Sequence, residues 1–307
     1  MTKVLLSVVG PTAIGKTALS IELAKHFNAE IISSDSRQFY KEMSIGTAAP
    51  SKKELSQVPH HFIHNKSIHN DYSVGQFEKD AIKKLDELFK SQKTVIMVGG
   101  SGLYINAVIQ GLDDFPEVDN SIRKQLNQRL KTDGIEVLQN QLNDLDPKSY
   151  NTIAIDNPQR LIRALEITIG TSKPYSSYLS NKTTERNFKA ISIGLTAERS
   201  VIYERINQRV DMMIENGLIE EAKKLYPFKH LNALNTVGYK ELFNYFDGEW
   251  TKEFAISEIK KNTRRFAKRQ LTWFRKDTSI RWFDYKTPTS EIINYTEAEV
   301  GKLKNPT

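Results

Sequence analysis

Residues 8–20 read VVGPTAIGKTALS, and this stretch decides the fold class. Gly10, Gly15, Lys16 and Thr17 fit the pattern G-x-x-x-x-G-K-[S/T]. An apolar strand pattern (3–9) precedes the loop and a helical pattern (17–27) follows it, as a P-loop requires. Backbone N–H groups of such a loop close on phosphate oxygens at the positive end of the helix. The residues expected to bind phosphate are Gly10, Pro11, Thr12, Ala13, Ile14, Gly15, Lys16 and Thr17.

Strand and helix patterns alternate along the first part of the chain. Apolar runs at 29–36, 94–104 and 188–195 predict further strands, and the run at 94–104 continues into a glycine turn. Residues 72–92 predict a helix. Alternation of this kind indicates a parallel sheet with helices on its faces. The predicted fold is therefore α/β, a P-loop NTPase-like parallel sheet flanked by helices.

A change in the pattern of apolar and polar residues predicts a second domain. Residues 113–187 carry Asp and Pro breakers and polar helical patterns without a buried strand, and from residue 197 onward the chain reads as almost wholly helical. We therefore expect a catalytic core of 1–112 and 188–307, interrupted by a helical insertion domain at 113–187.

Composition limits the partners. The chain of 307 residues has a net charge of +7 and no cysteine, which fits a reducing compartment. No apolar run is long enough for a membrane span and the N-terminal strand pattern is not a signal peptide, so a cytoplasmic location is expected. Eight basic residues and no acidic one lie between Lys260 and Lys276, among three aromatic residues. A basic, aromatic stretch is typical of a surface that binds a polyanion.

The sequence lacks an acidic residue at the strand end where P-loop NTPases usually have one, and it has Asp35 at the end of another strand pattern. The apolar strand pattern VIMVGG, within 94–104, ends in glycines, whereas P-loop NTPases usually end a strand on an acid that holds Mg²⁺. Asp35 ends the strand pattern at 29–36 and is either a turn aspartate or a general base facing the phosphate site. The second interpretation expects the two motifs at the carboxyl ends of neighbouring strands.

Two further groups admit two interpretations each. Arg205 and Arg209, four residues apart on one helical face, either form a solvated surface or clamp a diphosphate. Residues 58–69 contain four of the six histidines. Without cysteine or a clear supporting acid, a structural or surface role is favoured over a metal site.

An ordered series of motifs resembles the bacterial tRNA dimethylallyltransferase (IPP transferase) family over nearly the whole chain. The series comprises GPTAIGKT (10–17), SSDSRQFY (33–40), IGTAAP (45–50), VPHH (58–61), VGGSGLY (98–104), DP (146–147), DNPQRLIRALE (156–166), RVDMMIENGLIEE (209–221), TVGYKEL (236–242) and TRRFAKRQLTWFR (263–275).

The resemblance implies a reaction and site residues. N6 of the adenosine immediately 3′ of the anticodon in tRNA attacks C1 of dimethylallyl diphosphate, and diphosphate leaves with the help of Mg²⁺. Asp35 matches the family's general base, Lys16 and Thr17 match its diphosphate and Mg²⁺ groups, and Arg209 matches a diphosphate-binding arginine. The positions that match tRNA contacts are Asp35, Ser36, Arg37, Gln38, Ser101, Arg123, Gln159, Arg160, Leu161, Ile162, Arg163, Asn235, Thr236, Val237, Gly238, Tyr239 and Lys240.

The implied partners are the tRNA anticodon stem-loop and dimethylallyl diphosphate, with no membrane and a monomeric protein. Two alternatives are a P-loop small-molecule or nucleoside kinase and a non-catalytic, nucleotide-gated RNA-binding protein. Acceptor-dependent consumption of ATP distinguishes the first from a prenyltransferase, and tRNA binding without turnover distinguishes the second.

Overall fold

The computed structural model describes residues 2–179 and 184–304, which fall into two compact units. Unit 1 combines residues up to Gln110 with those from Arg186 onward, and unit 2 runs from Gly111 to Glu185. Each unit has its own hydrophobic core. The division lies two residues before the expected limits of the insertion at both ends.

A parallel sheet organises unit 1, with the strand order β3-β2-β4-β1-β5-β6. The strands are β1 (Val4–Val9), β2 (Ile31–Ser33), β3 (His60–His61), β4 (Thr94–Val98), β5 (Lys189–Thr196) and β6 (Arg281–Asp284). The predicted α/β class with a parallel sheet flanked by helices is confirmed. Two strands were not predicted, and the expectation of an almost wholly helical segment after residue 197 is wrong at β6. Both missed strands are short and lie at the edges of the sheet.

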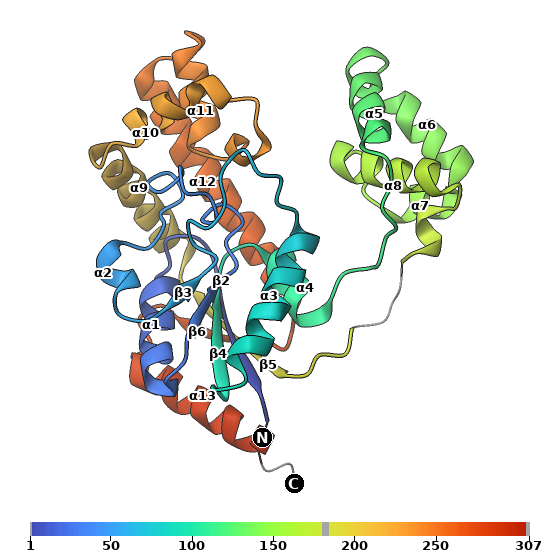
Figure 1. Ribbon diagram of the computed structural model, residues 1–307. Coiled ribbons are helices and arrows are strands. Elements are labelled where there is room, and N and C mark those ends of the chain that lie inside the picture. Colours follow the sequence, from blue (N-terminus) through green and yellow to red (C-terminus); the bar gives the residue numbers. More distant parts are fainter. Residues whose placement is uncertain (1, 180–183, 305–307) are drawn as a thin grey trace. The chain divides into compact units, whose positions relative to one another are not determined.

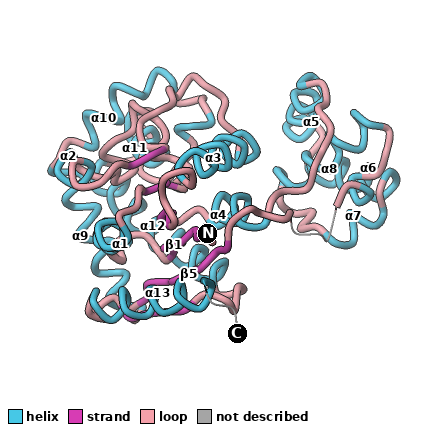
Figure 2. Tube along the Cα trace, turned by 60° about the horizontal axis from the view of Figure 1, so that its bottom comes forward, coloured by secondary structure: helices cyan, strands magenta, loops and turns pink. Residues whose placement is uncertain are grey.

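Helices cover both faces of this sheet (Figures 1 and 2). The α-helices of unit 1 are α1 (Lys16–Phe27), α2 (Lys52–Leu55), α3 (Val74–Leu88), α4 (Gly102–Gln110), α9 (Arg199–Glu215), α10 (Leu218–Leu225), α11 (Tyr239–Phe246), α12 (Lys252–Phe274) and α13 (Thr289–Lys304), and those that pack on the sheet include α1, α3, α4, α9 and α13. None of the helices in the described ranges combines the length and the apolar character that a bilayer span requires.

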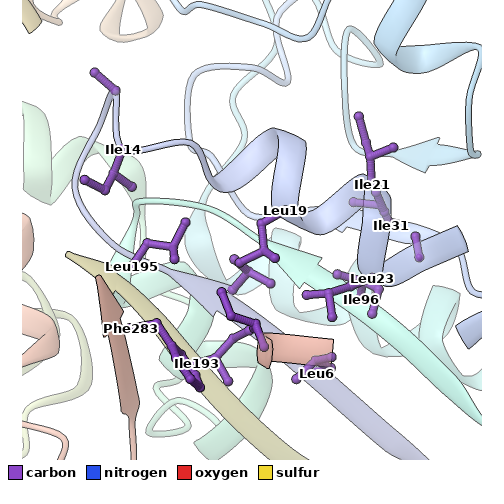
Figure 3. Packing of buried hydrophobic residues seen from close by; sticks show 14 of the residues in the cluster. Leu6, Ile14, Leu19, Ile21, Leu23, Ile31, Ile96, Ile193, Leu195 and Phe283 are labelled. Atoms are coloured by element: carbon purple, nitrogen blue, oxygen red, sulfur yellow. The ribbon is translucent and has the colours of Figure 1, made fainter. Parts of the chain in front are cut away.

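Alternate residues of each central strand face opposite sides, which gives unit 1 two core layers. Leu6 of β1 belongs to a cluster with Leu19 and Leu23 of α1, Ile193 of the neighbouring β5 and Phe283 of β6 (Figure 3). Leu5, the next residue on β1, joins instead a cluster with side chains of α3 and α4. Because β1 is completely buried between these layers, its carboxyl end holds the start of the following loop in a fixed position.

A third core cluster of unit 1 is built mainly from the chain after residue 209. It joins residues of α9, α10, α11 and the first half of α12 to Tyr40 and Met43 from the segment after β2. Two parts of the chain that are far apart in sequence therefore share one core beside the carboxyl end of β2.

Unit 2 is a small bundle of helices. Its helices are α5 (Asn120–Thr132), α6 (Ile135–Leu145), α7 (Pro147–Thr152) and α8 (Pro158–Thr171). Pro158 occupies the first turn of α8, and the side chain of Asn157 caps that helix by accepting the N–H groups of Gln159 and Arg160. α5 and α6 pack on α8 through Leu126, Leu138, Leu142 and Leu161. Among its described residues, Figure 2 shows helices and loops only.

Candidate active site

The P-loop links the carboxyl end of β1 to α1 through unusual backbone conformations. Gly10 and Gly15 have φ angles of 140° and 110°, a region that favours glycine. A Cβ atom on Gly10 would lie 2.5 Å from the carbonyl oxygen of Leu195, so no other residue fits there. Ala13 has a φ of 65°, which a non-glycine residue adopts only at a cost of order 1–3 kcal/mol. The loop is thus held in a strained shape by its surroundings.

Lys16 lies beneath this loop. Its ammonium group donates a hydrogen bond of 2.8 Å to the carbonyl oxygen of Pro11. Burial, together with the charge of Arg209, lowers the pKa of Lys16 to about 7, although the carboxylate of Asp35 opposes both effects. A second anion near Lys16 would favour its charged form, so phosphate oxygens at this loop would be bound by the full charge of the lysine.

Two arginines of α9 hold the loop from one side. The Nε of Arg205 donates to the carbonyl oxygen of Ala13 at 2.8 Å, and Arg209 donates to the hydroxyl of Thr12 at 3.3 Å. Burial and the neighbouring charge of Arg205 lower the pKa of Arg209. Both guanidinium groups therefore contact the P-loop, and a purely solvated face is the wrong interpretation for them.

Gln270 of α12 holds the loop from another side. This buried side chain accepts the backbone N–H of Thr12 at 2.9 Å and donates to the carbonyl oxygen of Gly100 at 2.9 Å. Both polar atoms of the amide are used. Gln270 thereby ties the P-loop to the glycine turn after β4, and it removes one N–H group of the loop from the set available to a ligand.

Asp35 follows the carboxyl end of β2. Its side chain accepts the backbone N–H of Arg37 at 3.0 Å, so Asp35 forms the turn that the interpretation as a turn aspartate expects. It also lines the same cavity as Lys16 and Thr17, as the other interpretation requires. The expectation that the two motifs follow neighbouring strands is wrong, because β4 lies between β1 and β2. The turn after β4 begins with Gly99 and Gly100, which have no side chains. These two residues line the cavity between the P-loop and Asp35 without filling it.

The segment after β2 is fixed by one carboxylate. Glu221 of α10 accepts the backbone N–H groups of Ser44, Ile45 and Gly46 at 2.9–3.0 Å, and the hydroxyl of Tyr239 at 2.7 Å. A Cβ atom on Gly46 would lie 2.6 Å from the Tyr239 ring. This arrangement sets the position of Thr47 and Ala48, whose carbonyl oxygens accept hydrogen bonds from the amide of Gln38.

Two adjoining cavities occupy this edge of the sheet. The first, of about 310 Å³, contains the P-loop, Asp35 and Gln38, and we call it the P-loop cavity. The second, of about 390 Å³, contains Asp35, Ser36, Arg37 and Ser101, and we call it the outer cavity. The residues that line both are Thr12, Asp35, Thr47, Ala48, Arg209 and Phe266. A reaction between ligands in the two cavities would take place at this boundary, beside Asp35.

The structure places most predicted RNA-contact residues of unit 1 around the outer cavity. Asn235, Thr236, Val237, Gly238 and Lys240 line it together with the residues after β2. Ser101 accepts the backbone N–H of Ser36 at 3.2 Å, which joins two of the motifs. Gln38 lines the P-loop cavity instead. Tyr239 is completely buried, so its side chain supports the site from behind and does not reach a ligand.

The predicted RNA-contact residues of unit 2 form a separate group. Glu166 is buried, and its carboxylate pairs with Arg123 at 2.8 Å and with Arg163 at 3.0 Å. Both guanidinium groups remain partly exposed and fixed in direction. Gln159 and Arg160 are exposed in the first turn of α8. Leu161 and Ile162 are buried in the core of unit 2, so direct contact of these two side chains with RNA is contradicted by their burial.

The basic stretch of α12 forms a continuous surface. A groove of about 400 Å³ is lined by Arg265, Lys268, Arg269, Thr272, Trp273 and Lys276. The indole of Trp273 lies so close to Gly102 that a Cβ atom there would be 2.2 Å away. Helical periodicity thus gathers the cations on one face of α12, while Gln270 on another face reaches the P-loop.

The histidine-rich segment lies at the edge of the sheet. His60 and His61 form β3, and the Nε2 of His61 lies 2.6 Å from the carboxylate of Glu30. Across the described residues, no group of three or more histidine or acidic side chains is arranged to hold a metal ion.

Sequence reasoning missed several residues of this site, including Gln270, Phe266 and Glu221. One signal was available for Gln270. It shares a helix face with the buried residues Ala267 and Phe274, at spacings of three and four, and is an uncharged polar residue on that face. For Glu221 no local signal exists, because all its partners lie far along the chain.

The residues present fit a magnesium ion that is shared with a diphosphate. Mg²⁺ keeps several water ligands and needs only one or two protein oxygens when phosphate oxygens supply others. Thr17 lines the P-loop cavity, and none of the hydrogen bonds among the described residues uses its hydroxyl. A ligand set made entirely of protein groups is not arranged there.

Comparison with known proteins gives one family. The sequence model described as "IPP transferase" matches residues 38–277 of this chain. A tRNA dimethylallyltransferase of Christiangramia forsetii is 63% identical over 301 residues, covering 98% of this chain and 100% of that relative. A tRNA dimethylallyltransferase of Flavobacterium johnsoniae is 57% identical over 299 residues, covering 95% and 97%.

Solved structures agree with the sequence comparison. A tRNA isopentenylpyrophosphate transferase from Bacillus halodurans has a TM-score of 0.74 and 40% identity, covering 99% of this chain and 98% of that one. A eukaryotic dimethylallyltransferase acting on tRNA has a TM-score of 0.82 and 25% identity, covering 98% of this chain and 80% of that one.

Proposed function

Because this chain belongs to the IPP transferase family, we propose that it transfers the dimethylallyl group of dimethylallyl diphosphate to N6 of the adenosine immediately 3′ of the anticodon in tRNA. The single observation that carries the reaction is that Lys16 and Asp35 line one cavity. A group that binds a leaving anion and a group that accepts a proton thus lie on the two sides of the transfer.

The diphosphate occupies the P-loop cavity in this proposal. Lys16, Arg209 and the N–H groups at the start of α1 neutralise its charge, which increases on the bridging oxygen as the bond to C1 breaks. The hydroxyl of Thr17, with diphosphate oxygens, would hold Mg²⁺, which supplies further charge neutralisation when bound. No carboxylate follows β4, consistent with a site in which no triphosphate is hydrolysed.

The adenosine enters through the outer cavity. N6 attacks C1 in line with the departing oxygen, so the N6–C1 bond forms as the C1–O bond breaks. Asp35 accepts the proton that N6 loses, and diphosphate leaves. The target base is in a loop, so extruding it from its stack costs only a few kcal/mol. The rate gain then comes mainly from orientation and from fixed charges.

The cationic surfaces bind the rest of the RNA. We assign the phosphates of the anticodon stem-loop to the basic groove of α12, and further RNA contacts to Arg123, Gln159, Arg160 and Arg163 of the insertion domain. All groups assigned to the reaction belong to one chain, which supports the proposal of a monomeric enzyme. The proposed tRNA substrate supports a cytoplasmic location.

Neither alternative function gains support. The relatives described above are tRNA-modifying enzymes and none is a kinase. A non-catalytic RNA-binding protein would not need a carboxylate beside the P-loop.

The test is a transfer assay with the purified protein, unmodified tRNA, Mg²⁺ and dimethylallyl diphosphate labelled in the prenyl group. We expect label in tRNA, and N6-(dimethylallyl)adenosine after digestion. A tRNA with guanosine at the target position is the control and should remain unlabelled. Absence of label from both RNAs, with ATP consumed in the presence of an acceptor, would establish the kinase instead.

A further inference from the structure

Phe266 is an aromatic side chain without a place in any core. It projects from α12, is 38% exposed, and belongs to none of the hydrophobic clusters found among the described residues. The guanidinium group of Arg269 lies 5.7 Å from the centre of its ring. A large apolar side chain that stays outside the core is available to a ligand.

Phe266 lies at the boundary between the two cavities. It lines both the P-loop cavity and the outer cavity. Of the six residues that line both, Asp35 and Arg209 are charged, and Thr12 and Thr47 carry hydroxyl groups. Ala48 and Phe266 are the two with apolar side chains, and only Phe266 is larger than a methyl group.

The geometry of the proposed reaction directs the prenyl chain to this boundary. With the diphosphate on the P-loop, in-line attack requires N6 and the departing oxygen on opposite sides of C1. C2, which carries the remaining carbons, is bonded to C1 at a wide angle to the line from N6 to the departing oxygen, so the prenyl chain extends sideways from that line. They must therefore pack against a wall of the boundary, and an apolar chain favours the Phe266 wall over Asp35 and Arg209.

We propose that Phe266 packs against the transferred prenyl group and limits its length, so that it determines selectivity for the five-carbon donor. This inference rests on the proposed function. A longer donor would extend toward the volume that the ring fills. Replacing the ring by a smaller side chain opens this volume without removing a charge or a hydrogen bond.

The experiment compares two donors on the same tRNA. Wild type, Phe266→Leu and Phe266→Ala are each given dimethylallyl diphosphate and geranyl diphosphate, which has ten carbons, and kcat/KM is measured for both. We expect the ratio of geranyl to dimethylallyl kcat/KM to rise by about tenfold or more in Phe266→Ala, the scale on which apolar pockets separate chains of different size. Phe266→Leu should give a smaller rise.

Phe254 provides a matched control on the same helix. It is also exposed and packs edge-on against Trp250, but it lines neither cavity. Phe254→Ala should leave the donor ratio unchanged. Because Phe266 lies outside the core clusters, Phe266→Leu and Phe266→Ala should keep the melting temperature of the wild type.

The outcomes separate this inference from the proposed function. If wild type transfers the five-carbon group and the ratio is unchanged in folded Phe266→Ala, Phe266 does not select the donor and the inference is overturned. A raised KM for tRNA with an unchanged donor ratio would assign the ring to the nucleobase and also overturn it. If wild type labels no tRNA from dimethylallyl diphosphate, the proposed function itself fails.

Discussion

The side chain of Gln270 accepts the backbone N–H of Thr12 at 2.9 Å, although 258 residues separate them in sequence. The P-loop is usually described as a local motif, with strand, loop and helix in one short segment. Here its conformation also depends on a helix from the last fifth of the chain. The same helix carries the basic groove on another face.

Gln270→Met tests whether this contact positions the loop for its ligand. Methionine has a similar shape and lacks both polar functions, so the N–H of Thr12 loses its partner at a cost of about 1–3 kcal/mol. We expect KM for dimethylallyl diphosphate to rise about tenfold, with a smaller change in kcat. Steady-state kinetics with saturating tRNA measures both.

The control for this substitution is Gln208→Met, at an exposed position of α9. It should change neither parameter. If Gln270→Met lowers only the melting temperature and leaves KM unaltered, the amide has a structural role alone.

Asp35→Asn removes the proposed proton acceptor and keeps the shape and the hydrogen bond to Arg37. Loss of general base catalysis predicts a fall in kcat of about 10²-fold or more, while the dissociation constant for tRNA should change little. Single-turnover rates and filter binding give the two quantities. The exposed Asp86→Asn is the control, and a near-normal single-turnover rate in Asp35→Asn would remove Asp35 from the base role.

Lys16 predicts a pH-dependent affinity for the leaving group. Burial and the charge of Arg209 lower its pKa to about 7, and bound pyrophosphate favours the charged form and raises that pKa. Below pH 7 Lys16 is already charged. Above pH 7 binding must take up a proton at Lys16, so the affinity should fall as pH rises from 7 to 9.

Titration calorimetry with pyrophosphate and Mg²⁺ at pH 8, in two buffers of different ionisation enthalpy, counts the protons taken up. Pyrophosphate contributes protons of its own, so Lys16→Gln is measured in parallel. The difference between wild type and Lys16→Gln should be a net uptake attributable to Lys16. Equal proton counts for both proteins would mean that the lysine is fully charged in the empty site.

The basic groove predicts a salt effect. Binding of tRNA releases counterions, so the logarithm of the association constant falls linearly with the logarithm of salt concentration. Replacing Arg265, Lys268 and Lys276 by alanine should reduce the slope by about 0.7–0.9 for each lost phosphate contact. Alanine at the exposed Lys79 and Lys83 of α3 and Lys90 just after it removes the same charge and should leave the slope unchanged. Equal slopes in the two triple variants would show that the groove of α12 does not contact RNA.

The local parts of this site were predictable from the sequence because their signals are local. The spacing of Gly10 and Gly15, with a strand before them and a helix after them, identifies the P-loop, and Asp35 is marked by its place after an apolar strand. Short edge strands give a weak signal. The two residues of β3 and the four of β6 resemble any other connection, so neither was predicted.

What the sequence could not give is the pairing of distant segments. That β4 separates β1 from β2 depends on the register of the whole sheet. The hydrogen bonds of Glu221 to the segment at 44–46 join residues about 175 apart. Burial of Tyr239, Leu161 and Ile162 is likewise a property of the assembled cores, and a motif alone cannot distinguish a residue that touches a ligand from one that supports it.

The central place of β1 has a consequence for the order in which the enzyme becomes active during its synthesis. β1 leaves the ribosome long before one of its two neighbours, β5, which begins at Lys189. Gln270, the partner of Thr12, emerges later still. A nascent chain that already carries the complete P-loop sequence therefore lacks the contacts that shape the loop. The capacity to bind diphosphate should arise only after Gln270 has emerged, so shorter nascent chains do not withdraw prenyl donor from the cell.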